Sequence, residues 1–265
     1  MTPATTPPTA LVTGATSGIG YELAKLFAQA GTNLVLVARR QPQLDAIKTD
    51  FEQRYGIRVT CLAADLGMPG QAEAVYAQCQ DQSLQLDYLV NNAGIGAYGK
   101  VAALPASQAT QMLTLNVVAL TVLTALVVRD MVARRAGRIL NVGSTSAFQP
   151  VPNMAAYGAS KSYIMSFTEA LHAELKGSGV TATVLSPGVT ETAFLELAHM
   201  GKAGIAQGGR LTAAEVARAG YEAMLKGKLN VIPGWKNRLL AFGIGLVPSR
   251  RLALAMSSLV MRESK

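Results

Sequence analysis

The chain has 265 residues, half of them hydrophobic, which is enough to bury a sizeable core in one large α/β domain or two small ones. Its formal net charge of +8 comes from 24 Lys and Arg against 16 Asp and Glu. Most of this excess lies in the last forty residues, where a single acid, Glu263, accompanies the basic residues. A nucleic-acid-binding protein more often spreads its basic residues along the face that meets phosphate, so we expect no nucleic acid partner.

The first nine residues are rich in Thr and Pro and predict a flexible tail without the basic and apolar regions of a signal peptide. The two cysteines, Cys61 and Cys79, are too few for a disulfide framework, and we expect reduced thiols. These features favour the cytoplasm. His172 and His199 have no partner at metal-ligand spacing, which predicts that there is no metal site.

Strands and helices are expected to alternate from residue 10 onward. The expected strands are 10–12, 33–38, 58–63, 88–90, 138–142, 180–185 and 229–232, and the expected helices are 21–30, 44–55, 71–80, 107–135, 155–176 and 213–225. Alternation at this spacing predicts parallel strands joined by right-handed crossover helices. We therefore predict one doubly wound Rossmann-type α/β domain over residues 10–238, followed by an extension over 239–265.

A glycine-rich turn follows the first expected strand and opens the first expected helix. It reads Thr13-Gly14-Ala15-Thr16-Ser17-Gly18-Ile19-Gly20, a GxxxGxG spacing that differs from the commonest dinucleotide-binding fingerprint. The helix N-terminus offers unpaired N–H groups and a positive end, and glycines let the backbone approach a phosphate. This position between strand and helix favours a dinucleotide site over an ordinary tight turn.

The second expected strand ends in Ala38-Arg39-Arg40. NAD-binding units of this kind carry an acid at about this distance from the glycine-rich turn, where it binds the ribose 2′-hydroxyl. Two guanidinium groups replace that acid here, and a guanidinium matches a phosphate in bidentate geometry. Arg39 and Arg40 therefore predict NADP(H), with a solvated surface pair as the alternative.

Tyr157 and Lys161 lie four residues apart on one expected helix, and so on one helix face. A tyrosine hydroxyl titrates near pH 10, and a nearby ammonium lowers that pKa toward the working range of an acid–base catalyst. Taken alone, such a pair is more often two exposed surface residues without a catalytic role. Ser144, however, follows another strand and should lie at the carboxyl edge of the sheet, where ligands bind in such folds.

Together these motifs resemble the short-chain dehydrogenase/reductase family, and the resemblance covers about two thirds of the chain. The matching positions, in order, are Thr13–Gly20, Asp65 with Leu66, Asn91-Asn92-Ala93-Gly94, Asn116, Ser144, Tyr157, Lys161, and Pro187-Gly188 with Thr190 and Thr192. Gly143 departs from many family members, which have a second serine there, but the spacing from Ser144 to Tyr157 is kept.

The resemblance implies a role for each catalytic position. Tyr157 would exchange the hydroxyl proton, Lys161 would lower its pKa and bind the nicotinamide ribose, and Ser144 would hydrogen-bond the substrate oxygen. Asn116 would hold a water between Lys161 and solvent. Asn91 would steady the central strand.

The cofactor positions implied by the resemblance and by the glycine-rich turn form a larger set. They are Gly14, Thr16, Ser17, Gly18, Ile19, Gly20, Arg39, Arg40, Asp65, Leu66, Asn92, Ala93, Gly94, Tyr157, Lys161, Pro187, Gly188, Thr190 and Thr192.

The favoured function is NADPH-dependent reduction of a carbonyl, such as a 3-oxoacyl thioester or another hydrophobic ketone, to the alcohol. An alcohol dehydrogenase working in the oxidative direction is the first alternative. A cofactor-sensing protein with little turnover is the second, although it would not need Ser144, Tyr157 and Lys161 together. Family members of this kind are expected to form homodimers or homotetramers.

Two segments outside the motifs bear on substrate and partners. The segment 190–210 combines Phe194, Leu195, Leu197 and Met200 with several glycines, which suits a lid over an apolar or bulky substrate. Beyond residue 238, apolar runs at 239–247 and 252–261 are too short to span a bilayer. They could form a subunit interface, lie on the inner face of an acidic membrane, bind an acidic acyl carrier, or cover the core.

Overall fold

A computed structural model describes residues 7–191, 210–245, 247 and 249–260 of the chain. Its centre is a seven-stranded, all-parallel sheet in the order β3-β2-β1-β4-β5-β6-β9. The strands are β1 Thr9–Thr13, β2 Asn33–Ala38, β3 Val59–Ala63, β4 Tyr88–Asn91, β5 Gly137–Val142, β6 Val180–Leu185 and β9 Asn230–Val231. The strand order reverses between β1 and β4, which opens a crevice at the carboxyl ends of these two strands. This architecture confirms the predicted doubly wound fold.

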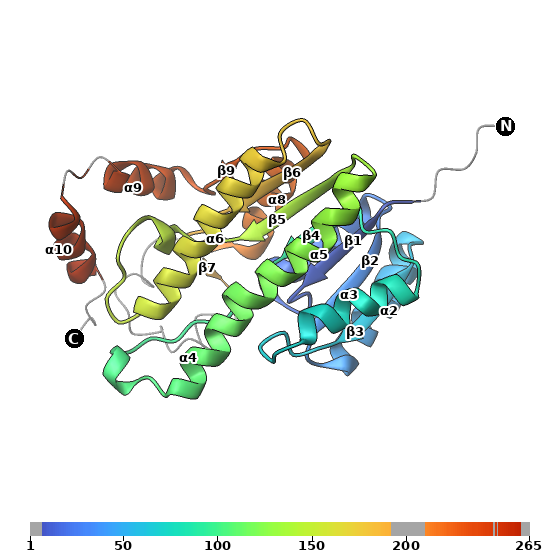
Figure 1. The fold of residues 1–265 in the computed structure, drawn as a ribbon, viewed down its shortest axis with the longest axis horizontal. Coiled ribbons are helices and arrows are strands. Elements are labelled where there is room, and N and C mark those ends of the chain that lie inside the picture. Colours follow the sequence, from blue (N-terminus) through green and yellow to red (C-terminus); the bar gives the residue numbers. More distant parts are fainter. Residues whose placement is uncertain (1–6, 192–209, 246, 248, 261–265) are drawn as a thin grey trace.

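Helices cover both faces of the sheet (Figure 1). They are α1 Gly18–Gln29, α2 Gln41–Tyr55, α3 Gln71–Asp81, α4 Ala106–Leu113, α5 Leu120–Ala133, α6 Ala155–Glu174, α8 Ala213–Leu225, α9 Trp235–Gly245 and α10 Arg250–Val260. Short helical turns span Val101–Ala103 and Thr145–Phe148, and a two-stranded ribbon pairs β7 Thr190–Glu191 with β8 Leu211–Thr212.

Two apolar cores separate these layers. On one face α1 and α8 pack together around Phe27, which is fully buried and stacks edge-on against Tyr221. On the other face α3, α5 and α6 cover the sheet, with Leu123 and Met131 of α5 buried against it. The central strands are apolar on both sides because both faces are covered.

The predicted helix 107–135 is continuous but not uniform. Between α4 and α5 the chain forms a π-helical segment, Thr114–Ala119. Its backbone hydrogen bonds span five residues instead of four, so the helix is locally wider. Such segments are often found at functional sites. Residues 106–133 are also long and apolar enough to cross a membrane by length and composition. Because α5 packs its inner face on the sheet, we describe this helix as a core helix.

Smaller differences from the expected boundaries have local causes. The first helix begins at Gly18 instead of Tyr21, because the last glycines of the turn already form its first turn. The second begins at Gln41 instead of Leu44, since Pro42 occupies a first-turn position that needs no N–H donor. Thr9, expected in the tail, starts β1 by donating its N–H to Asp87.

Most of the expected lid, residues 192–209 with Thr192, lies outside the described residues. The last helix pair is described in large part, and α9 begins at Trp235, so it runs across the expected boundary at residue 238. Cys61 and Cys79 are both free thiols.

Candidate functional site

The glycine-rich turn between β1 and α1 is shaped by close backbone contacts. Gly14 has φ +65° and Gly18 φ +56°, a region that side chains rarely adopt. A Cβ at Gly20 would collide with the carbonyl oxygen of Gly14 and the amide nitrogen of Asn92. The first turn of α1 contains no acidic residue. Its N–H groups and positive end are therefore available to an anion.

The strand β4 is followed by Asn92, which fixes this turn from the side. Its side-chain amide donates to the carbonyl oxygens of Thr13 (3.0 Å) and Gly14 (3.1 Å). Its backbone N–H donates to the Thr13 hydroxyl at 3.0 Å. The sequence assigned Asn92 to the cofactor. The structure shows that its amide holds the loop, while the residue also lines the cavity described below.

A buried polar network joins the sheet to the helices that carry the site. The Asn91 amide donates to Thr124 of α5 and to Asn141 of β5, both at 2.9 Å. Asn141 in turn donates to Thr168 of α6 at 2.9 Å, and Thr168 donates to the Ile164 carbonyl. Asn91, Thr124, Asn141 and Thr168 are almost completely buried. Because buried amides need such partners, the network fixes α6 against the sheet.

Tyr157 and Lys161 lie on the buried side of α6, beside the end of β5. The Lys161 ammonium donates to the Val142 carbonyl at 2.9 Å and lies 5.7 Å from the centre of the Tyr157 ring. Burial lowers the pKa of Lys161 to about 8. Burial also raises the pKa of Tyr157 to about 12, although a hydrogen bond with Ser144 opposes this shift. Tyr157 is thus a protonated donor at neutral pH, and the expected lowering of its pKa by Lys161 is not observed, because burial has the larger effect.

Ser144 and Asn116 flank this pair. Ser144 is buried, and its hydroxyl also accepts from the Ser146 N–H at 3.1 Å, which begins the short helical turn after β5. Asn116 lies in the π-helical segment. Its amide donates to the Ile95 carbonyl and to Ser160, and its oxygen accepts from the Ile95 N–H. Asn116 therefore holds the loop after β4 beside α6.

One cavity of about 460 Å³ at the carboxyl edge of the sheet collects most of the predicted site. Its walls include Gly14, Thr16, Ser17, Gly18, Ile19, Arg39, Arg40, Asp65, Leu66, Asn92, Ala93, Gly94, Ser144, Tyr157, Lys161, Pro187, Gly188 and Thr190. Gly20 and Asn116 do not line the cavity, but they contact residues that do: Gly20 packs against Gly14, and Asn116 lies beside Gly94. The glycine-rich turn, the two arginines and the Tyr157–Lys161 pair therefore line the same cavity.

Gln108 and Gln111 of α4 also line the cavity, and the sequence analysis missed them. Neither belongs to a motif, and a polar residue on a predicted helix is usually solvated. Ile95 and Gly96, also missed, directly follow the Asn91-Asn92-Ala93-Gly94 motif. An extension of that motif by two residues would have found them.

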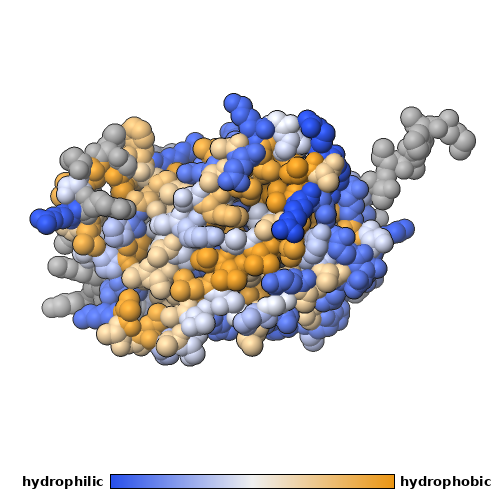
Figure 2. Space-filling view, viewed as in Figure 1, coloured by the Kyte–Doolittle hydropathy of each residue, from blue (hydrophilic) through white to orange (hydrophobic). Residues whose placement is uncertain are grey.

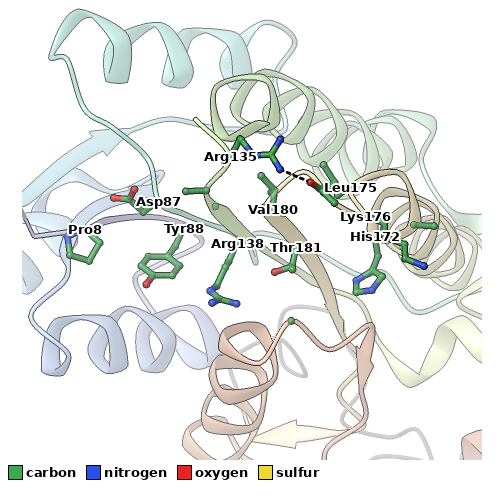
Figure 3. A pocket seen from close by; sticks show the side chains of 16 residues that line it. Pro8, Asp87, Tyr88, Arg135, Arg138, His172, Leu175, Lys176, Val180 and Thr181 are labelled. Carbon is green, nitrogen blue, oxygen red and sulfur yellow. Dashed lines mark hydrogen bonds between the residues drawn. The ribbon is translucent and has the colours of Figure 1, made fainter. Parts of the chain in front are cut away.

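A second cavity, of about 960 Å³, lies at the opposite, amino edge of the sheet (Figure 3). It contains Arg135, Arg138, His172 and Lys176. The guanidinium of Arg135 donates to the Gly177 carbonyl at 3.0 Å, and Arg138 points the other way. The His172 ring bonds the Ala182 carbonyl. The basic side chains of this cavity do not converge, so we take the cavity at the carboxyl edge as the candidate site.

Comparison with known proteins agrees with this geometry. A profile of the short chain dehydrogenase family matches residues 8–202. A 7beta-hydroxysteroid dehydrogenase of Collinsella aerofaciens is 30% identical over 233 residues, which cover 86% of each chain. A very-long-chain 3-oxoacyl-CoA reductase of Pyrenophora tritici-repentis is 33% identical over 71% of this chain. The chain spans 56% of the length of that reductase and less than two thirds of several other relatives.

Among solved structures, a short-chain dehydrogenase from Sphingobium yanoikuyae, in complex with NADPH, superposes with a TM-score of 0.81. It is 31% identical, and the match covers 97% of this chain and 98% of that one. The likeness therefore extends through nearly the whole fold.

Proposed function

Because the chain belongs to the short-chain dehydrogenase family, we propose that it reduces a hydrophobic ketone to the alcohol with NADPH, using Tyr157 as the general acid. The observation that carries the proposal is the single cavity that joins the glycine-rich turn, the arginine pair and the Tyr157–Lys161 pair. In this arrangement a cofactor phosphate at the turn and a carbonyl beside Tyr157 would occupy one continuous space.

The residues present fit a phosphate-bearing dinucleotide. The turn leaves no room for a Cβ at Gly14 or Gly20, so the backbone itself forms the contact surface. Arg39 and Arg40 are exposed at the mouth of the cavity, and neither forms an ion pair within the described part of the chain. Their guanidinium groups would bind a 2′-phosphate, and Lys161 would bind the nicotinamide ribose. When bound, NADPH supplies the hydride.

The chain's own residues supply the proton and the orientation. A carbonyl oxygen beside Ser144 and Tyr157 accepts two hydrogen bonds, which stabilise the negative charge that develops on it during reduction. Tyr157 then transfers its proton to that oxygen. The raised pKa of Tyr157 keeps the donor protonated before reaction, and the buried Lys161 ammonium stabilises the phenolate afterward.

The relatives support a hydrophobic substrate class. One is named for a hydroxysteroid and another for a very-long-chain 3-oxoacyl thioester, and both substrates carry large apolar bodies. The cavity wall of this chain adds Ile95, Leu115 and Val189, and Ile95 packs against the apolar cluster that contains Tyr157. We propose that these side chains contact the apolar part of the substrate.

We also propose that the protein forms a homo-oligomer through the outer face of α5 and α6. The 18 residues from Gln111 to Val128 contain no charge, and Val118 and Tyr163 are 51% and 39% exposed. Figure 2 shows hydrophobic residues gathered on this side of the molecule. An uncharged apolar face of this kind is typical of a permanent subunit interface. The solution mass measures it directly.

The proposed activity is tested by following NADPH absorbance with a panel of ketones: a steroid ketone, a long-chain 3-oxoacyl thioester, and small polar ketones as controls. We expect turnover with the large apolar substrates and little with the small ones. The same panel run as alcohols with NADP⁺ measures the reverse direction. Tight NADPH binding without turnover on any substrate would instead support a cofactor-sensing protein.

A further inference from the structure

The two C-terminal helices, α9 and α10, present an apolar outer surface. We call this the tail surface and define it by Trp235, Leu239, Leu240, Phe242, Leu252 and Leu254. These side chains are 70%, 64%, 64%, 67%, 50% and 45% exposed, respectively. Single exposed apolar residues are ordinary on a protein surface, but six large ones on two short helices mark an interaction site.

The helices are anchored by their inner sides. Ala241 and Ala253 are buried, and the buried Ser257 hydroxyl donates to the Pro150 carbonyl at 2.6 Å. The side chain of Asn237 lies directly against Gly188, which lines the cavity. Because the inner side of each helix packs against the domain, the exposed apolar side chains face away from it. The helix α9 also lies near the cavity, because it packs against the helical turn Thr145–Phe148, in which Thr145 and Ser146 line the cavity.

The charge of the tail surface indicates which kind of partner could bind it. Lys236, Arg238 and Arg251 are exposed beside the apolar side chains, and none forms an ion pair among the described residues. No acidic residue occurs in the sequence between Glu222 and Glu263. A second copy docked face to face would oppose like charges on this surface. An anionic surface would complement them.

Length and composition identify the kind of anionic surface. Each helix has 11 residues, too few to cross a bilayer. Exposed Trp and aliphatic side chains interspersed with basic ones favour the headgroup region of an anionic membrane. We propose that the tail surface docks the protein on an anionic lipid bilayer, with α9 and α10 in the plane of the headgroups.

This docking deepens the proposed function, on which its substrate consequence rests. With the tail surface on the bilayer, the side of the cavity lined by Gly188 lies near the lipid, so a membrane-dissolved ketone can reach Tyr157 without crossing bulk water. The docking itself does not depend on turnover. It can therefore be tested even if the proposed activity fails.

The experiment is co-sedimentation of the full chain with vesicles of phosphatidylglycerol and phosphatidylcholine, and with vesicles of phosphatidylcholine alone. We expect binding to the anionic vesicles at low salt and much weaker binding at high salt, where the charges are screened. One basic residue near such a surface contributes about fivefold in affinity. The variant Lys236→Gln with Arg238→Gln and Arg251→Gln should therefore bind roughly a hundredfold more weakly.

The apolar contribution is tested with Trp235→Ser combined with Leu239→Ser, which should also lose vesicle binding. The matched controls are Arg58→Gln with Lys100→Gln and Lys176→Gln for charge, and Met68→Ser with Val101→Ser for apolar exposure. These exposed residues lie on other elements, and their variants should bind vesicles like the wild type. Circular dichroism and NADPH affinity show that each variant is folded.

Two results would overturn the proposal. One is equal sedimentation with neutral and anionic vesicles, or none with either at low salt. The other is a fall in solution mass for the folded tail variants while the wild type ignores vesicles, which would make the tail surface a subunit interface.

Discussion

The buried Lys161 should make NADPH affinity depend on pH, and this dependence can be measured without a substrate. Burial lowers its pKa to about 8, while Tyr157, with a pKa raised to about 12, stays protonated through the same range. The proposed role of Lys161 is to bind the ribose of an anionic cofactor as an ammonium. Because the group loses its charge as the pH rises through 8, NADPH affinity should be highest below that pH and fall above it.

The size of the effect follows from the titration. A base with a pKa of 8 is about nine-tenths charged at pH 7 and about one-tenth charged at pH 9. If only the charged form makes the contact, the Kd for NADPH should rise roughly tenfold between these two pH values. That change corresponds to about 1.4 kcal/mol, close to the range expected for a hydrogen bond to a charged group.

The assay is a fluorescence titration of NADPH at several pH values between 6.5 and 9.5. Lys161→Met keeps the unbranched apolar part of the side chain, one atom shorter, and removes the charge, so its Kd should be higher at pH 7 and nearly independent of pH. Circular dichroism at each pH confirms that the fold is kept. A flat profile for the wild type, or the same rise in Lys161→Met, would refute the assignment of the charge to Lys161.

Three further substitutions test other parts of the account. Arg39→Ala with Arg40→Ala should reduce the preference for NADPH over NADH by at least about tenfold, about 1.4 kcal/mol, in paired cofactor titrations; an unchanged ratio would contradict the 2′-phosphate assignment. Gly20→Ala should abolish cofactor binding in the same titration, because its Cβ collides with the carbonyl oxygen of Gly14. The control is Gly56→Ala, at a left-handed position with open space, which should lose only about 1 kcal/mol of stability and keep cofactor binding. Asn141→Leu should lower the free energy of unfolding by about 1–3 kcal/mol in urea denaturation, since the buried Asn91 amide and the buried Thr168 hydroxyl each lose one hydrogen bond; a loss below about 0.5 kcal/mol would show that the network is not needed.

Much of the fold was predictable because it depends on sequence patterns within single segments. The strands 33–38 and 180–185 and the helix 213–225 were predicted to the residue, since continuous apolar runs and helical spacing are properties of the segment itself. The helix 213–225 also has a capping box between Thr212 and Glu215, which fixes its start.

The candidate site was predictable for a different reason. In a parallel sheet, residues that follow successive strands meet at one edge, so Arg39, Asp65, Asn92 and Ser144 had to lie close together once the strands were known. What could not be predicted depends on tertiary contacts. The π-helical segment around Asn116 and the cavity contacts of Gln111 arise from packing that no local pattern records.

The tail shows the same limit. Its two apolar runs were evident, but their helical form and their anchors were not, because the contacts of Ser257 with Pro150 and of Asn237 with Gly188 join distant parts of the chain. Only the structure shows which side chains face inward and which remain exposed.

The central claim is that Tyr157 donates the proton in an NADPH-dependent carbonyl reduction. Its most direct test is a single-turnover measurement of NADPH oxidation by the wild type and by Tyr157→Phe, with the best ketone of the panel and with NADPH affinity measured in parallel. The substitution removes one hydroxyl and little volume from a buried position. The account predicts a rate at least about a thousandfold lower, as expected for the loss of a positioned acid, with nearly unchanged NADPH affinity. A variant that keeps a tenth or more of the wild-type rate would contradict it.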